Sequence, residues 1–416
     1  MTDDAHHPTT VTRRQLLAGT GLASAALAAA AASTVSVPPA GAASDAATAP
    51  SATVPFHGPH QSGIGTPEQA HLVFAAFDVT APDRAGLAAL LTTWTEAARR
   101  LTAGRPVAGP TALLTPPPDS GEALGLGPSR LTLTVGYGPS LFDGRFGLAP
   151  QRPEALVELP PFAGDALDTL RSGGDLCIQA CADDAQVAFH AVHNLGRLAL
   201  GSATVRYLQV GFGRTASPGA GQPTPRNLLG FRDGTNNLVA GDQGAMDTFV
   251  WVDSPGWMSG GTYLVARRIR THLEAWDRST LDDQERTIGR VKATGAPLGA
   301  ARAVDPVDLK ALGPDGQPLI PTHAHIRVAA PSSHRGRAIL RRGYSFVDGI
   351  DPVTGELDAG LFFICFQNDP RRQFIPIQQS LAQQDALVQY LTHTGSGIFA
   401  CPPGTGPERA WGDGLL

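Results

Sequence analysis

Cysteine and lysine are scarce in this chain of 416 residues, and aromatic residues make up only 6% of it. Four cysteines in so long a chain are no disulfide framework of the kind that stabilises small secreted domains. The net charge of −5 excludes the strongly basic surface typical of proteins that bind nucleic acid or anionic membranes. Beyond the N-terminal region, no segment is apolar and long enough to cross a bilayer. We therefore expect a globular protein with neither nucleic acid nor a membrane as partner.

The N-terminal region has the features of an export signal. Arg13 and Arg14 form a twin-arginine sequence ahead of an Ala-rich apolar run, and Ala40-Gly41-Ala42 offers a small-x-small cleavage site. The run is too short and too poor in bulky residues for a convincing membrane span. We predict that residues 1–42 are a twin-arginine signal peptide, which places the chain in the periplasm, in the cell envelope or outside the cell. An uncleaved anchor or a disordered tail is the alternative.

The pattern of apolar residues predicts a similar order of elements in two halves. In the first half we expect strands at 71–79, 131–136, 175–182 and 203–212, and helices at 84–101 and 183–200. In the second half we expect strands at 262–269, 323–329, 338–346, 360–367 and 397–401, and helices at 279–290 and 376–391. Two β-α-β-β-α-β-type units predict an α+β fold of duplicated ferredoxin-like domains, with antiparallel sheets and peripheral helices.

This pattern divides the chain into four parts. After the signal peptide, residues 43–53 are rich in Ala, Pro and Ser and are predicted to be a disordered linker. We assign residues 54–229 to the N-terminal half and residues 230–416 to the C-terminal half. Cys177 and Cys181 lie on one face of a predicted strand, so we interpret them as buried core residues rather than metal ligands.

The segment Gly230–Asn237 (G-F-R-D-G-T-N-N) is the most informative motif of the chain. Asp233 precedes Gly234, and a glycine there lets the backbone take a positive φ that aims the carboxylate inward. An isolated Asp-Gly pair is most often an ordinary turn. A functional interpretation is favoured here because His325 and the Arg341-Arg342 pair follow, each inside an apolar, strand-like segment.

The alternation of these two segments predicts where the side chains point. His325 and Arg327 should share one face of a strand, whereas Arg341 and Arg342 should point to opposite faces, so that at most one of them enters a given pocket. A buried arginine needs an anionic partner, for which Asp233 or a bound anion is suitable.

A carboxylate, a permanent cation and an imidazole in one apolar chamber suit the heterolysis of a peroxide O–O bond. The carboxylate is the base that takes the first proton, and the arginine stabilises the departing oxygen because it stays charged. A metal must accept the oxidising equivalents, and a haem held by a neutral imidazole provides it.

These motifs resemble those of the dye-decolorizing peroxidases, whose G-x-x-D-G motif matches Gly230–Gly234. Further matching segments occur in order at 54–64, 159–165, 172–179, 260–270, 340–346 and 362–369. The resemblance covers the chain from Val54 to its end and looks closest to the exported branch that includes deferrochelatase/peroxidases. It implies two ferredoxin-like halves arranged like a dimeric α+β barrel, with one haem b in the C-terminal half.

The resemblance also implies roles for individual residues. Asp233 is implied to be the distal acid/base, Arg341 the distal arginine and His325 the axial ligand of the haem iron. Phe363 is implied to close the distal wall. Further haem contacts are implied for Gly234, Thr235, Asn236 and Pro331.

Two positions distinguish this chain within the family pattern. Gly343 stands where some members carry Asn, which fits the exported branch. A carboxylate late in the chain commonly accepts a hydrogen bond from the axial imidazole and strengthens its donation to the iron. The predicted last helix offers two candidates for this partner, Gln389 and, one turn earlier, Asp385.

We therefore predict a haem b peroxidase that reduces hydrogen peroxide and oxidises a small aromatic reductant, either phenolic or dye-like. Large dyes cannot reach a buried haem, so electrons would pass through surface aromatics, although core packing is the alternative role of each candidate. The candidates are Trp251, Trp257, Trp276, Tyr263, Tyr344 and Tyr390.

Two other functions compete with this one. The first keeps the haem but acts in iron acquisition, either by oxidising ferrous iron for an iron-uptake system or by releasing iron from haem. The second is an exported binding module without cofactor, in which Asp233, His325 and Arg341 form a structural ion network. The sequence leaves open whether the chain forms a homo-oligomer.

Overall fold

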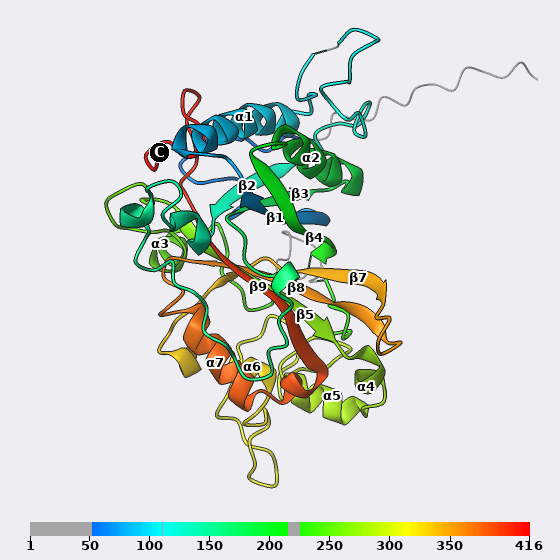
Figure 1. The fold of residues 1–416 in the computed structure, drawn as a ribbon. Helices are drawn as coiled ribbons and strands as arrows, with labels where there is room; N and C mark the ends of the chain where they lie inside the picture. The colour runs from blue at the N-terminus through cyan, green and yellow to red at the C-terminus, as the bar shows by residue number, and fades with distance from the viewer. Residues whose placement is uncertain (1–51, 110, 215–224) are drawn as a thin grey trace, which may run out of the picture. The chain divides into compact units, whose positions relative to one another are not determined.

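The computed structural model describes residues 52–109, 111–214 and 225–416 (Figure 1). The predicted signal peptide and all but the last two residues of the predicted linker lie outside the described residues. None of the helices in these three ranges has the length and apolar character that crossing a membrane requires.

In the N-terminal half, two helices cover one face of four antiparallel strands (Figure 1). The elements are β1 (His71–Val79), α1 (Arg84–Thr102), β2 (Thr132–Tyr137), β3 (Leu176–Ala182), α2 (Ala185–Leu198) and β4 (Ala203–Arg214). Each helix begins at an aspartate: Asp83 accepts a hydrogen bond from Gly86 N, and Asp184 accepts from Gln186 N and Val187 N. Short 3-10 helices are η1 (Pro139–Phe142), η2 (Ala149–Gln151) and η3 (Thr169–Arg171).

The C-terminal half carries five strands and several short helices. The strands are β5 (Thr262–Thr271), β6 (Leu340–Arg341), β7 (Tyr344–Ile350), β8 (Leu357–Gln367) and β9 (Leu391–Cys401). The helices are α3 (Gln243–Phe249), α4 (Leu273–Asp277), α5 (Leu281–Ile288), α6 (His325–Val328), α7 (Phe374–Gln384), η4 (Pro331–His334) and η5 (Ala386–Tyr390).

The strands of both halves join into one sheet. Their order is β5-β9-β2-β3-β1-β4-β7-β8-β6, and β5 also pairs with β8, which closes the sheet into a barrel. The halves meet where β4 pairs with β7 and where β2 pairs with β9. The predicted α+β fold class, a ferredoxin-like duplication arranged like a dimeric α+β barrel, is confirmed.

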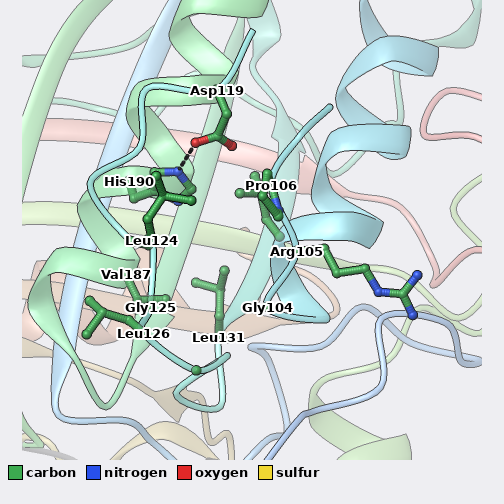
Figure 2. Close-up of a pocket in the computed structure, with 13 residues that line it drawn as sticks. Gly104, Arg105, Pro106, Asp119, Leu124, Gly125, Leu126, Leu131, Val187 and His190 are labelled. Carbon is green, nitrogen blue, oxygen red and sulfur yellow. Dashed lines mark hydrogen bonds and ion pairs between the residues drawn. The ribbon is translucent and has the colours of Figure 1, made fainter. Parts of the chain in front are cut away.

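A long connection between α1 and β2 is held against α2. Asp119 Oδ1 lies 2.9 Å from His190 Nε2, and the Asp119 carboxylate also accepts from Val107 N and Gly121 N. Burial alone would raise the pKa of Asp119, but these hydrogen bonds lower it below its usual value. The pair lies beside a cavity of about 100 Å³ that is lined mainly by apolar residues (Figure 2). We interpret it as a structural anchor of the connection.

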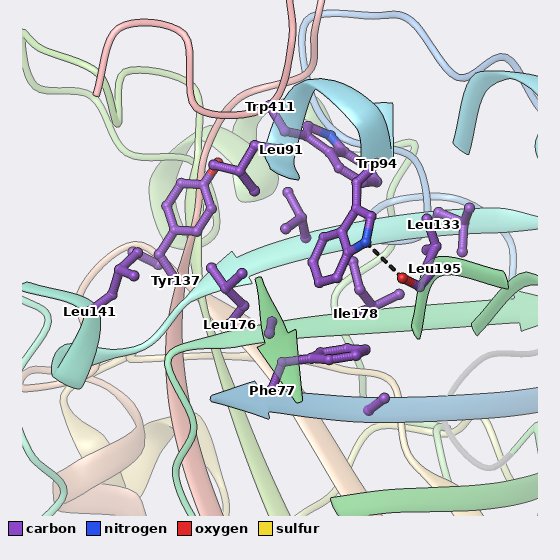
Figure 3. Packing of buried hydrophobic residues seen from close by; sticks show 14 of the residues in the cluster. Phe77, Leu91, Trp94, Leu133, Tyr137, Leu141, Leu176, Ile178, Leu195 and Trp411 are labelled. Carbon is purple, nitrogen blue, oxygen red and sulfur yellow. Dashed lines mark hydrogen bonds between the residues drawn. The ribbon is translucent and has the colours of Figure 1, made fainter. Parts of the chain in front are cut away.

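The helices of the N-terminal half pack on β1 to β3 through one large apolar core (Figure 3). Trp94 of α1 is fully buried, with its ring centroid 5.0 Å from that of Phe77. Its indole N–H donates to Leu195 O of α2 at 2.8 Å, so the one polar atom of the side chain is satisfied. All four cysteines are buried and free, as expected for Cys177 and Cys181 in the core.

The prediction of a strand at residues 323–329 is wrong, because the segment forms the single helical turn α6. Val328 N and Ala329 N donate to the carbonyls four residues earlier, at 3.1 and 2.9 Å, so the backbone bonds locally instead of to a neighbouring strand. Alternation over seven residues between two prolines fits either structure. His325 and Arg327 therefore do not share a strand face.

Two predicted boundaries also differ. The helix predicted at 376–391 is divided: α7 ends at Gln384, and Asp385 takes an extended backbone (φ −78°, ψ 122°) and caps η5. The strand predicted at 338–346 is interrupted after Arg341, so that β6 and β7 pair separately with β8.

Candidate active site

A cavity of about 320 Å³ lies in the C-terminal half, between strands β5 and β8 and the helices α6 and α7. Its walls are mainly apolar, with Leu361 and Phe363 from β8 and Ile377 and Leu381 from α7. All the site residues predicted from the sequence line this cavity: Asp233, Gly234, Thr235, Asn236, His325, Pro331, Arg341 and Phe363. The fold therefore brings together side chains that are up to 130 positions apart in the sequence.

Asp233 and Arg341 form an ion pair at the cavity. Arg341 Nη1 donates to Asp233 Oδ1 at 2.6 Å, and Gly234 N donates to the same oxygen at 2.7 Å. The φ of Gly234 is +86°, which is the positive value that the Asp-Gly turn predicts. Burial would raise the pKa of Asp233, but the charge and the hydrogen bond of Arg341 lower it below its usual value. Asp233 is therefore held as a carboxylate.

Asn237, which the sequence analysis did not select, fixes the backbone that carries Arg341. Asn237 Nδ2 donates to Arg341 O at 2.8 Å, and Arg341 N donates to Asn237 Oδ1 at 2.9 Å. On its other side Arg341 pairs with Cys365 of β8. The Asn237 carboxamide thus makes the two backbone hydrogen bonds that a second neighbouring strand would otherwise make with β6. Its place in the motif of Asp233 was the only signal in the sequence.

Arg342 points away from the cavity, as the alternation predicts. Its guanidinium is buried and donates to Thr66 O at 2.6 Å and to Gln69 Oε1 at 2.5 Å. Arg341 is the arginine that enters the pocket, and Asp233 is its anionic partner.

His325 stands at the start of α6 with its ring held by a carboxylate. Its Nδ1 lies 2.6 Å from Asp385 Oδ2, and the side chain of Asp385 is only 3% exposed. Burial lowers the pKa of His325, but the neighbouring Asp385 outweighs that effect, so that the pKa is raised. With Nδ1 bound to Asp385, Nε2 is the ring nitrogen available to a metal.

Of the two candidate partners of His325, the structure selects Asp385. Gln389 is exposed, and its Nε2 donates to Ala386 O at 3.0 Å within η5. Asp385 reaches the ring because α7 ends one residue earlier and the chain turns there toward α6. Its second oxygen, Oδ1, accepts from Leu387 N at 2.9 Å, which fixes the orientation of the carboxylate.

Four further basic residues of the cavity wall were not selected from the sequence: Arg232, Arg290, Arg337 and His393. Burial and the nearby Arg267 lower the pKa of His393 to about 3, so this imidazole is neutral at physiological pH. Arg232 lies inside the Gly230–Asn237 motif without a predicted role, and the other three lie outside the motifs that carry the recognisable site.

Most of the six candidate electron-transfer aromatics pack in the core. Trp251, Trp276, Tyr263 and Tyr344 are buried, and only Trp257 and Tyr390 are half-buried. Tyr390 makes an edge contact with Trp276 at 5.0 Å between ring centroids, and Trp276 contacts Phe231 of the cavity wall at 6.0 Å. Of the two half-buried candidates, Tyr390 is therefore the one that aromatic contacts connect to the cavity, through Trp276 and Phe231.

Comparison with known proteins gives consistent matches along the chain. The family model described as "Dyp-type peroxidase, N-terminal" matches residues 61–213, and the model described as "Dyp-type peroxidase, C-terminal" matches residues 224–406. The protein named deferrochelatase of Escherichia coli (strain K12) is 39% identical over 358 residues, which are 84% of this chain and 84% of that protein. The deferrochelatase of Yersinia pestis bv. Antiqua (strain Nepal516) is 38% identical over 97% of this chain and 93% of its own length.

Solved structures agree with these matches. A DyP-type peroxidase from Streptomyces coelicolor superposes with a TM-score of 0.82 at 43% identity and covers 88% of this chain and 97% of its own. Ferric DtpA from Streptomyces lividans gives a TM-score of 0.80 at 43% identity, with 87% and 96% covered.

Proposed function

We propose roles for three residues on the premise that the chain belongs to the Dyp-type peroxidase family and is therefore a haem-dependent oxidoreductase that uses hydrogen peroxide. In this proposal His325 holds the haem iron, and Asp233 and Arg341 act on the peroxide. The binding module without cofactor is therefore not retained. Phenolic or dye-like compounds are the proposed reductants.

The cavity fits a haem b. A haem needs flat apolar walls and an axial ligand. Phe363 of β8 and Leu381 of α7 contribute to the walls, and His325 offers a nitrogen whose orientation Asp385 fixes. We propose further haem contacts for Gly234, Thr235, Asn236 and Pro331, which line the same cavity. When bound, the haem supplies the electrons that reduce the peroxide.

The residues of the opposite wall supply the proton transfer. Asp233 Oδ1 already accepts two hydrogen bonds, whereas Oδ2 accepts none from the described residues. We propose that Oδ2 takes the proton from one peroxide oxygen and returns it to the other, which then leaves as water. Arg341 stabilises the negative charge that develops on the departing oxygen and keeps Asp233 ionised before the reaction.

The observation that carries this proposal is that the Asp233–Arg341 pair and the His325–Asp385 pair line one apolar cavity. The test is the rate of reaction of the haem-loaded protein with peroxide, followed by stopped-flow absorbance. Asp233→Asn should lower this rate by about 100-fold or more, since general-base catalysis contributes that much, with haem still bound. Asp242→Asn is the control, because Asp242 only caps α3. An unchanged rate in Asp233→Asn would remove the proposed base.

The names of the relatives favour a second role, in iron acquisition. The same haem site would then serve to oxidise ferrous iron for an uptake system or to release iron from haem. Two measurements distinguish the roles: the rate of ferrous iron oxidation relative to dye oxidation at equal peroxide, and the appearance of fluorescent iron-free porphyrin. Dye oxidation that is faster than both supports the peroxidase role.

We also propose the chain organisation that the sequence suggests. Apart from Asn227, Leu228 and Leu229, all residues that line the cavity fall in the predicted C-terminal half, which supports a haem site carried by that half. Export by the twin-arginine route is tested by replacing Arg13 and Arg14 with lysine and locating the product. A protein that still leaves the cytoplasm would contradict it.

A further inference from the structure

Arg290 is a buried cation in the wall of the active-site cavity. It follows α5 and the left-handed Gly289, whose φ is +90°. Its side chain is only 4% exposed. Nη1 donates to Gly295 O at 2.9 Å and to Ala303 O at 3.2 Å, and both of these acceptors are neutral carbonyls. A guanidinium buried without an anion is costly, so its surroundings need an explanation.

The buried arginines of β5 show how this fold treats the same charge elsewhere. Each of them pairs with one or two carboxylates: Arg267 with Asp165, Arg268 with Asp348 and Asp358, and Arg270 with Asp351 and Glu356. Within the described part of the chain, Arg290 has no carboxylate within 4 Å. Arg342 is also buried on neutral acceptors, Thr66 O and Gln69 Oε1, but it lies outside the cavity, whereas Arg290 lines it. An anion for Arg290 can therefore come from an occupant of the cavity.

Two donor atoms of Arg290 have no hydrogen-bond partner among the described residues. Its Nε and Nη2 make no hydrogen bond to a described residue, yet neither is sealed in the core, unlike Nε of Arg267 or Arg342. Since Arg290 lines the cavity, an occupant can reach these N–H groups. The charges of Asp233 and Arg341 also act on Arg290, but these two residues already pair with each other.

We propose that Arg290 binds a carboxylate of the cavity's occupant, namely one propionate of the haem. The planar guanidinium suits this ligand because two parallel N–H groups match the two oxygens of a carboxylate. The inference rests on the proposed haem site and adds a second anchor, independent of the iron ligand. It also predicts the orientation of the haem in the cavity, since the edge that carries this propionate then faces the segment that follows α5.

The test compares haem with its dimethyl ester, which has the same ring and iron but no carboxylates. The full-length protein is loaded with either form, and loss of the porphyrin to excess apomyoglobin is followed by absorbance. The wild-type protein should lose the ester about 10- to 100-fold faster than haem, as expected for a lost hydrogen bond to a charged group. Equal rates of loss from the wild-type protein would overturn the proposal without any variant.

Variants locate the effect. Arg290→Gln should lose haem about 10- to 100-fold faster than the wild type and should no longer distinguish haem from the ester. Arg290→Lys, which keeps the charge, should retain part of the discrimination. Arg337→Gln is the matched control, because Arg337 also lines the cavity but is only half-buried. Discrimination that is kept in Arg290→Gln and lost in Arg337→Gln would assign the carboxylate to Arg337 and refute the proposal.

The stability of the haem-free protein separates binding from a purely structural role. If Arg290 only held the loop through Gly295 and Ala303, Arg290→Gln would unfold at lower denaturant and would bind haem and ester with unchanged preference. Removal of an unpaired buried charge should instead leave the haem-free protein as stable as the wild type, or more stable. A wild-type protein that shows no Soret band after haem addition would contradict the haem site itself, which distinguishes that failure from this one.

Discussion

Replacing Asp385 with asparagine removes the charge beside His325, the proposed iron ligand, and keeps the shape of the side chain. Asp385 Oδ2 lies 2.6 Å from His325 Nδ1, and the carboxylate is buried, so the interaction is charge-assisted and poorly screened. A hydrogen bond to a charged group contributes about 1.5–3 kcal/mol and a neutral one about 1 kcal/mol. Asp385→Asn should therefore cost about 0.5–2 kcal/mol, which is roughly a 2- to 30-fold weaker binding of ferric haem.

Haem transfer to apomyoglobin measures this weaker binding, and a variant of Gln389 is the control. Gln389→Ala removes the other candidate partner, an exposed side chain that bonds only within η5, and should leave haem binding unchanged. The cap of η5 survives in Asp385→Asn because Asn Oδ1 can still accept from Leu387 N. Wild-type affinity in Asp385→Asn, or a loss in Gln389→Ala instead, would refute the assignment of Asp385.

Three further predictions concern the opposite wall and the surface. Arg341→Gln removes the charge that lowers the pKa of Asp233, so burial should then raise this pKa. The rate of the peroxide reaction should therefore begin to fall at a higher pH when the solution is acidified. A pH–rate profile identical to that of the wild type would contradict this. Asn237→Ala removes two hydrogen bonds to the backbone of Arg341 and should slow the peroxide reaction about 10-fold without changing the haem spectrum; an unchanged stopped-flow rate would show that β6 needs no such support. Tyr390→Phe should slow the oxidation of bulky dyes but not of small phenols in steady-state assays, whereas equal effects on both would argue against an electron route through Tyr390.

The geometry of Gly234 and Arg341 was predictable because it depends on local sequence patterns. An Asp-Gly pair specifies a turn with positive φ at Gly234, and alternation separates Arg341 from Arg342 whatever the length of the strand. Both features depend on two or three neighbouring residues. Both features are therefore present in the structure, even though the predicted strand around Arg341 is interrupted.

His325, Asp385 and Asn237 were harder to predict, because each contacts a segment that is far away in the chain. The sequence pattern predicts a strand at His325, since seven residues between prolines do not distinguish a strand from a helical turn. The break of the last helix at Asp385 has no glycine or proline to announce it, so a continuous helix left Gln389 as an equal candidate. Asn237 contacts a backbone 104 residues away, which no local pattern encodes.

The absorption spectrum of the haem-loaded protein and of His325→Ala tests the central claim most directly. The wild type should show an intense Soret band that changes when hydrogen peroxide is added. His325→Ala should lose the spectrum of the imidazole-ligated haem, because His325 is the proposed axial ligand. A normal haem spectrum and a normal response to peroxide in His325→Ala would contradict the account.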